Sequence, residues 1–312
     1  MARLQIGSES FREIREKDLC YVDKTSFLED FFYSSFIKVS LIARPRRFGK
    51  TLMMSMLHDF FDIRQDSRAL FEGLAISKNK EICDKWMNQC PVVFLTFKGI
   101  EGQTFEDALK KIRSRISNIC IEYSFLSDSI SVDKRIRERL SLLKAESAED
   151  SMLSDSLKTL CMALYAHYGK PAILLIDEYD VPLAKAYNYG YYDKMSMFLR
   201  DMLDEGLKTN TFLEFGILTG CLRISGESFF TGLNNFKCFG ISDEFYADKF
   251  GFTSEEVDDL LAATGFSEKK EEIKAWYDGY LFGDDTEIYC PWDILQYVDD
   301  LQVKSTAMPK AY

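Results

Sequence analysis

A lysine followed by a threonine closes the run Arg44-Pro45-Arg46-Arg47-Phe48-Gly49-Lys50-Thr51. An apolar stretch precedes this run and helically spaced apolar residues follow it, which is the setting of a phosphate-binding (Walker A) loop. The backbone N–H groups of such a loop and of the helix start after it favour bound phosphates. Lys50 would contact the β- and γ-phosphates of a nucleotide, and the Thr51 hydroxyl would ligate Mg²⁺. The run therefore predicts a site for a nucleotide and its magnesium ion.

The loop departs from the pattern G-x-x-x-x-G-K-[ST], because Arg44 stands at the position of the first glycine. The loop entrance must then form without the backbone freedom of glycine. Three arginines in four positions supply a positive potential that suits a triphosphate, although they could equally be solvated charges of a basic loop. We expect the nucleotide contacts to come from eight residues: Arg44, Arg46, Arg47, Phe48, Gly49, Lys50, Thr51 and Leu52.

Two acids, Asp177 and Glu178, follow the apolar run Ile173-Leu174-Leu175-Ile176. Ligand sites in open α/β sheets lie outside the carboxyl ends of the strands, so these acids stand where such a site forms. Asp177 would hold Mg²⁺ through water, as in a Walker B strand, and Glu178 would polarise the attacking water as general base. Asp180 would either help to hold the metal or cap the next helix.

A third apolar run, 212–218, ends in Thr219-Gly220. A hydroxyl at that strand end would suit a sensor that contacts the γ-phosphate or the attacking water, and the alternative is a threonine that simply ends a strand. Arg223 follows four residues later. It could stabilise transition-state charge, as arginine fingers do, or be an ordinary surface arginine.

The elements that must position these residues alternate along the chain. Four continuous apolar runs predict strands that are buried on both faces of a parallel sheet: 37–42, 91–97, 172–176 and 212–218. Stretches with helical spacing lie between them, at 51–61, 105–123, 134–143, 153–168 and 194–207. This alternation predicts an α/β fold. The polar stretch 124–155 is interpreted as a helical insertion or a surface loop.

The pattern changes near residue 250. A helix start with acids in its first turn, Ser254-Glu255-Glu256, opens a series of short helices at 255–263, 268–277 and 293–301. We therefore expect a core over residues 1–250, a small helical lid subdomain over 251–302, and a linker over 303–312 that leads to a further C-terminal domain.

Composition limits the classes of function. Lys and Arg total 39 against 50 Asp and Glu in 312 residues, a net charge of −11, which disfavours a general nucleic-acid coat. The chain has two His, which argues against a His-ligated zinc site or a His-based triad. Its eight Cys show no C-x-x-C spacing, so we expect reduced thiols in a cytoplasmic protein. We find neither a signal peptide at the start nor an apolar run long enough to span a membrane.

These motifs together resemble the bacterial AAA-ATPase-like family. The resemblance extends from about residue 6 to 301 and includes Tyr21-Val22-Asp23-Lys24-Thr25, the arginine-rich loop, the Asp177-Glu178 strand, the segment from Thr219, and Tyr289-Cys290-Pro291-Trp292. In this family the absence of the first loop glycine is usual, whereas Cys290 stands where asparagine is more common. The resemblance implies a P-loop NTPase three-layer sandwich of the additional-strand type, with the sensor strand between the loop strand and the acid strand. It also implies ATP as the nucleotide and a PD-(D/E)XK nuclease-like domain beyond the chain.

Three functions remain open from the sequence. The first is a Mg²⁺-dependent ATPase whose lid moves with the nucleotide state and controls an attached domain. The second is a nucleotide-binding switch with little hydrolysis. The third is the ATPase module of a nuclease-linked defence protein that acts on DNA, although the acidic charge argues against nucleic-acid binding by this chain. The preference for adenine over guanine rests on the resemblance alone.

Overall fold

The computed structural model describes residues 3–33, 37–208, 210–221, 236–277 and 279–312. Its central sheet has five parallel strands in the order β2-β3-β4-β1-β5. The strands are β1 (Val39–Ala43), β2 (Val92–Thr96), β3 (Ala172–Asp177), β4 (Leu213–Gly220) and β5 (Phe236–Phe239). Because β4 lies between β1 and β3, the strand order confirms the predicted additional-strand arrangement.

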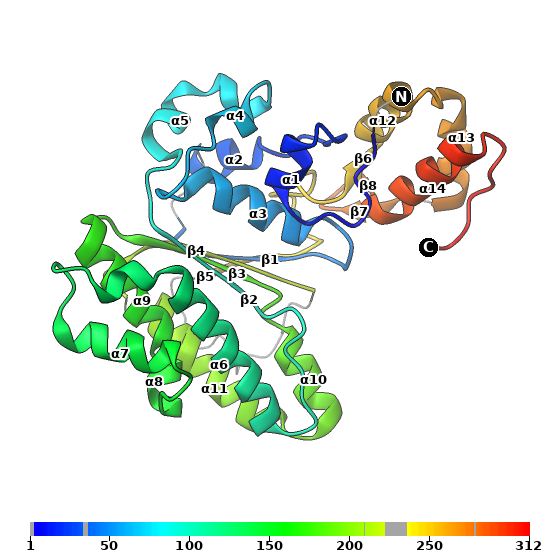
Figure 1. Cartoon of the computed structure of the whole chain (residues 1–312). Helices are drawn as coiled ribbons and strands as arrows, with labels where there is room; N and C mark the ends of the chain where they lie inside the picture. The colour runs from blue at the N-terminus through cyan, green and yellow to red at the C-terminus, as the bar shows by residue number, and fades with distance from the viewer. Residues whose placement is uncertain (1–2, 34–36, 209, 222–235, 278) are drawn as a thin grey trace.

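Helices cover both faces of the sheet, which confirms the three-layer α/β architecture (Figure 1). One layer contains α1 (Phe11–Glu16), α2 (Phe27–Tyr33), α3 (Lys50–Phe61), α4 (Arg68–Phe71) and α5 (Lys80–Trp86). The other contains α6 (Phe105–Glu122), α7 (Lys134–Lys144), α8 (Asp150–Ser154), α9 (Ser156–Tyr168), α10 (Val181–Tyr189) and α11 (Tyr192–Leu207). Each layer packs its own hydrophobic cluster against one face of the sheet, which is why the predicted strands read as continuous apolar runs.

The four predicted strands are present, and β5 is an addition. Its sequence, Phe-Lys-Cys-Phe, is short, polar at its second position and pairs only with β1 at the sheet edge, so periodicity gives no signal for it. The stretch 124–155 folds as a short 3₁₀ turn (Ser124–Ser127) followed by α7 and α8. Its apolar residues, among them Leu140 and Leu153, join the cluster beneath the sheet.

The last sixty residues form a small α/β unit beside the carboxyl ends of the strands (Figure 1). It contains α12 (Ser254–Thr264), α13 (Lys270–Tyr277) and α14 (Pro291–Val303), together with an antiparallel sheet in the order β6-β8-β7. Its strands are β6 (Phe252–Thr253), β7 (Tyr280–Phe282) and β8 (Thr286–Tyr289), which are too short to alternate visibly in sequence. The three helices pack a hydrophobic cluster of their own.

Residues 304–312 pack on this unit instead of extending away from it. The Tyr277 hydroxyl donates to the Lys310 carbonyl at 3.1 Å, and the Tyr312 hydroxyl donates to the Asp300 carboxylate at 2.6 Å. Within the described part of the chain, no helix is both long enough and apolar enough to cross a membrane.

Candidate active site

The loop between β1 and α3 ends in a helix start that no side chain caps. Its N-cap residue is Gly49, in the left-handed region at φ 82°, and Arg47 before it has φ 69°. The first-turn N–H groups of a helix have no partner within the helix. By contrast, Thr104 caps α6 and Thr253 caps α12 with their hydroxyls. The start of α3 therefore offers N–H groups that no side chain caps, directly after the arginine-rich loop, to an anion.

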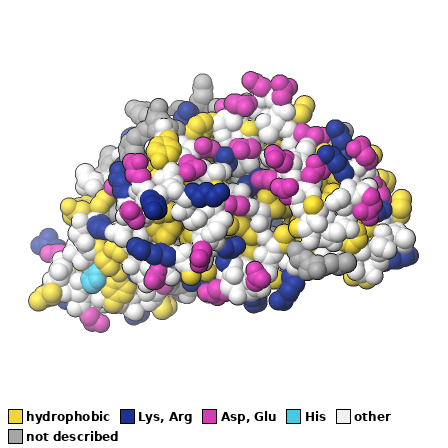
Figure 2. Space-filling model, turned by 90° about the horizontal axis from the view of Figure 1, so that it is seen from above, with side chains coloured by type: hydrophobic (Ala, Val, Ile, Leu, Met, Phe, Trp, Pro, Cys, Tyr) yellow, Lys and Arg dark blue, Asp and Glu magenta, His cyan; other side chains and the backbone are white. Residues whose placement is uncertain are grey.

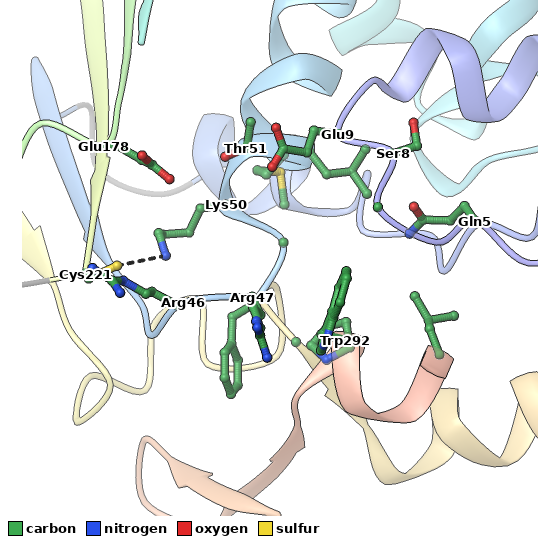
Figure 3. A pocket seen from close by; sticks show the side chains of 18 of the residues that line it. Gln5, Ser8, Glu9, Arg46, Arg47, Lys50, Thr51, Glu178, Cys221 and Trp292 are labelled. Atoms are coloured by element: carbon green, nitrogen blue, oxygen red, sulfur yellow. Dashed lines mark hydrogen bonds between the residues drawn. The ribbon is translucent and has the colours of Figure 1, made fainter. Parts of the chain in front are cut away.

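Lys50, the first residue of α3, folds its ammonium back over the loop. Its Nζ donates to the carbonyl oxygens of Arg44 at 3.0 Å and Pro45 at 2.7 Å. The Cys221 sulfur lies 3.5 Å from the same nitrogen, as Figure 3 shows. Cys221 follows β4 directly, and the sequence analysis did not single it out.

The buried carboxylate of Asp177 accepts hydrogen bonds from two hydroxyls, one at the start of α3 and one near the end of β4. Thr51 Oγ1 donates to Asp177 Oδ2 at 3.0 Å, and Thr219 Oγ1 donates to Asp177 Oδ1 at 2.5 Å. Asp177 and Thr219 are both fully buried. Burial raises the pKa of Asp177 above the usual aspartate range, although the two hydroxyls and Lys50 act to lower it. Thr219 thus contacts the acid, and its expected contact with the γ-phosphate or the attacking water stays a prediction.

Glu178 presents its carboxylate to a cavity that Lys50 and Thr51 also line (Figure 3). Its backbone has φ 54°, a strained value for a residue with a side chain. Burial is the main cause that raises the pKa of Glu178, and the neighbouring Asp177 adds to it, whereas Lys98 and Lys50 act to lower it. A carboxylate whose pKa is raised toward neutrality is the kind of group that general-base chemistry uses.

An ion pair that the sequence analysis missed lies beside Glu178. Lys98 Nζ contacts both carboxylate oxygens of Glu9, at 2.5 Å and 2.6 Å. Glu9 is separated from Lys98 by 89 residues of sequence and carries no local signal. Lys98, however, follows the predicted strand 91–97, so its place at the carboxyl edge of the sheet was available from the rule that puts sites there.

Asp180 holds the strand ends together. Its Oδ2 accepts a hydrogen bond from the Cys221 N–H at 2.9 Å, and its side chain makes no capping bond to α10. Of the two roles expected for Asp180, helix capping is therefore not observed.

The structure corrects the expected role of Arg44. Its guanidinium is fully buried and donates to main-chain carbonyls, among them those of Gly240 at 2.8 Å and Tyr246 at 2.9 Å, so it does not reach the cavity. Phe48 is also buried, with its ring stacked on Phe282 of β7 at a centroid distance of 5.5 Å. These two of the eight expected nucleotide contacts can act only through their main chain.

The other two arginines of the loop are exposed and line the cavity with Gly49, Lys50, Thr51 and Leu52. Arg47 lies over the ring of Trp292 at 5.0 Å and donates to the Tyr312 carbonyl at 2.7 Å. Arg46 lies beside Cys221 in the lining of the cavity (Figure 3). Arg223 lies outside the described residues.

The cavity has a volume of about 850 Å³, which is ample for a nucleotide. One half is charged and consists of the loop, Glu178 and Glu9. The other half lies between the N-terminal segment and the helices α12 and α14 and is mainly apolar, with these side chains: Ile6, Cys20, Tyr21, Val22, Phe252, Leu260, Trp292 and Leu295. Gln5 and Gln296 add amide groups to this apolar half.

The residues of the charged half fit a nucleotide with Mg²⁺. Among the described residues, no three His, Cys, Asp or Glu side chains gather into a metal site. Mg²⁺, however, usually takes one or two protein oxygens and completes its shell with phosphate and water. The Thr51 hydroxyl and the Asp177 carboxylate, 3.0 Å apart beside an uncapped helix start, supply such oxygens.

Comparison with known proteins agrees with this geometry. Over 295 residues the chain is 27% identical to a protein of Azotobacter chroococcum mcd 1 that is described as an uncharacterized protein in the vnfD 5' region. The match covers 94% of this chain and 51% of that protein, so the chain spans about half the length of its relative. A profile of the AAA-ATPase-like family, described as predicted AAA-ATPase, matches residues 5–230. The chain therefore belongs to the AAA-ATPase-like family.

Proposed function

We propose that the chain is a Mg²⁺-dependent ATPase. The observation that carries this proposal is the contact of the Thr51 hydroxyl with the Asp177 carboxylate, 3.0 Å apart at the uncapped start of α3. Glu178 opens to the same cavity with a raised pKa. Membership of a family of predicted ATPases supports the same reading.

Each residue of the charged half has a distinct task in this proposal. Lys50 would hold phosphate oxygens in place of the two carbonyls that it contacts in the structure. Thr51 and Asp177 would hold the magnesium ion, which when bound neutralises charge that develops on the phosphates. Thr219 would keep the Asp177 carboxylate oriented through its 2.5 Å hydrogen bond. Glu178 would orient the attacking water and accept its proton.

The apolar half of the cavity would take the base. A purine needs flat apolar walls and a few polar groups at its edge. Tyr21, Leu260 and Trp292 offer apolar walls, and the amides of Gln5 and Gln296 offer polar groups. Residues 251–302 would then act as a lid whose position follows the nucleotide state. Two contacts support this link: the Gly251 N–H donates to the Phe48 carbonyl at 3.1 Å, and Arg47 lies over Trp292.

The charge distribution favours a nucleotide over a duplex. Acidic and basic side chains are interspersed on the face that Figure 2 shows, with no large area of positive charge that could follow a phosphate backbone. A net charge of −11 adds a general repulsion. Nucleic-acid binding therefore gains no support from this face.

Two substitutions test the proposal. Lys50→Ala should abolish ATP binding, because it removes the cation that holds the phosphates. Glu178→Gln should bind ATP but lose turnover by about 10²-fold or more, because a glutamine cannot accept the proton. Binding is measured by calorimetry and hydrolysis by phosphate release.

Lys80→Ala is the matched control for Lys50→Ala, because Lys80 also opens a helix but lies on α5 away from the cavity. Hydrolysis at the parent rate by both site variants would overturn the ATPase assignment. Tight ATP binding by the parent with no turnover, even in a single-turnover experiment, would instead identify a nucleotide-binding switch.

A further inference from the structure

Arg44 carries a buried charge for which the proposed chemistry has no use. Its Nη1 donates to the carbonyls of Ala43 at 3.0 Å, Phe239 at 3.0 Å and Gly240 at 2.8 Å, and its Nη2 donates to Tyr246 at 2.9 Å. Within the described part of the chain it forms no ion pair, and its buried Nε has no hydrogen-bond partner. Burial lowers the pKa of Arg44 to about 10, so the guanidinium stays protonated at neutral pH. An apolar side chain of similar length would avoid these costs.

The groups around the guanidinium belong to three different segments. Phe239 ends β5, and Gly240 and Tyr246 lie on the connection that leads to the lid. The rings of Phe250 and Phe282 each lie 5.4 Å from the guanidinium carbon. Phe282 ends β7 of the lid. One side chain thus contacts the sheet edge, the connection and the lid.

The main chain of Arg44 contacts the catalytic side of the same junction. Its carbonyl accepts the 3.0 Å hydrogen bond from Lys50 Nζ. Its N–H donates at 3.1 Å to the carbonyl of Gly220, the last residue of β4. A shift of the lid that moved the guanidinium would therefore also move the atoms that fix Lys50, because the fork of four hydrogen bonds leaves the side chain little freedom.

We propose that Arg44 is a positioning residue that couples the lid to the phosphate loop, so that closure of the lid sets the position of Lys50. The proposal rests on the proposed ATPase function. It also accounts for an arginine at a loop position where other P-loops have glycine. The side chain turns away from the phosphates and contacts Phe282 of the lid instead.

The test compares four chains: the parent, Arg44→Met, Phe282→Leu and the double variant. Arg44→Met keeps the length of the side chain and removes the fork, and Phe282→Leu removes the ring on the lid side. Leu140→Ala on α7 is the control for lost stability, because Leu140 is buried in the cluster beneath the sheet and does not line the cavity. The background carries Trp86→Phe and Trp276→Phe, so that fluorescence reports Trp292 in the cavity.

We expect the variants to keep ATP binding and to lose the conformational response to bound ATP. Arg44→Met should bind ATP within about fivefold of the parent but lose most of the ATP-dependent change in Trp292 fluorescence, with kcat lower by about tenfold or more. Phe282→Leu should show the same defect in weaker form, and the double variant should be no worse than Arg44→Met, because both act on one junction. Arg44→Lys, which keeps the charge and part of the bonding, should restore some of the response.

Three outcomes would overturn the proposal. One is Arg44→Met behaving like Leu140→Ala, with reduced stability and unchanged kinetics. Another is kcat defects of Arg44→Met and Phe282→Leu that multiply, which would mean independent effects. The third is a parent chain that does not bind ATP, and that result alone would also remove the proposed function.

Discussion

Gly220, the last residue of β4, leaves no room for a side chain. A Cβ at this position would lie 2.5 Å and 2.8 Å from two ring carbons of Tyr179 and 2.9 Å from Asp180 Oδ1. Tyr179 is 1% exposed, and its N–H donates to the Thr219 carbonyl at 3.1 Å. The ring therefore cannot turn away into solvent. Gly220→Ala must push the backbone that joins Glu178 to Asp180.

The size of the effect follows from these distances. Carbon atoms in contact normally lie about 3.5–4.0 Å apart, so the Tyr179 ring must retreat by about 1 Å. Overpacking of this kind costs about 1–3 kcal/mol of folding free energy. Glu178 is joined directly to Tyr179, and a misplacement of about 1 Å in a catalytic group lowers the rate by about 10²-fold. We expect Gly220→Ala to lower kcat for ATP hydrolysis by that factor.

Gly216 on the same strand provides the matched control. A Cβ there would meet the end of the Leu207 side chain at 2.7 Å, and its next contacts lie at 3.8 Å, so a flexible group absorbs the change far from the acids. Urea unfolding and phosphate release are measured for both alanine variants. Both should lose some stability, and only Gly220→Ala should lose activity. Equal losses of activity in the two variants, or parent activity in Gly220→Ala, would refute the argument that Tyr179 positions Glu178.

Two further predictions concern the acids. Asp177→Asn should abolish hydrolysis yet raise the free energy of unfolding of the metal-free chain by about 1 kcal/mol. Burial raises the folded-state pKa of Asp177 above its unfolded value, so the ionised carboxylate costs stability once the pH rises past the unfolded pKa, and no cost remains at lower pH, where both states are protonated. Urea unfolding in EDTA should therefore show a gain that is absent below the unfolded pKa, grows as the pH rises toward the raised folded pKa and then stays constant; a gain independent of pH would contradict it. Lys98 lowers the pKa of Glu178 and Glu9 raises it, so Lys98→Met should move the acid limb of the pH–rate profile to higher pH and Glu9→Gln to lower pH. Shifts in the same direction would exclude a direct electrostatic effect.

The sequence predicted the sheet because burial on both faces makes each strand a continuous apolar run, as in β1 and β3. Periodicity could not give the order of the strands, and the family resemblance gave only the place of β4 between β1 and β3. Apolar runs could not predict β5 and β7, because these strands are four and three residues long and carry no repeat. The conformation of such short strands is set by pairing with a neighbouring strand, β1 for β5 and β8 for β7.

The chemistry of the site was easier to predict than the direction of its side chains. Lys50 and Glu178 line one cavity, as their residue types and positions beside strand ends indicated. Arg44 was assigned to the phosphates on its charge alone, but charge does not say where a long side chain points. Its place at a glycine position was the signal, because a side chain there must turn away from the loop. Glu9 offered no signal, since only the tertiary fold brings it to Lys98.

The strand order has a consequence for the order in which the chain folds. β4 is the middle strand between β1 and β3, yet it is made after both of them. The contacts of Asp177 with Thr51 and Thr219 span 126 and 42 residues. A nascent chain that has not yet released β4 from the ribosome can form neither the continuous sheet nor the acid–hydroxyl cluster. Such long-range pairing is slow, so the site should appear late and in one step, and fragments that end before β4 should be prone to aggregation because their strand edges stay open.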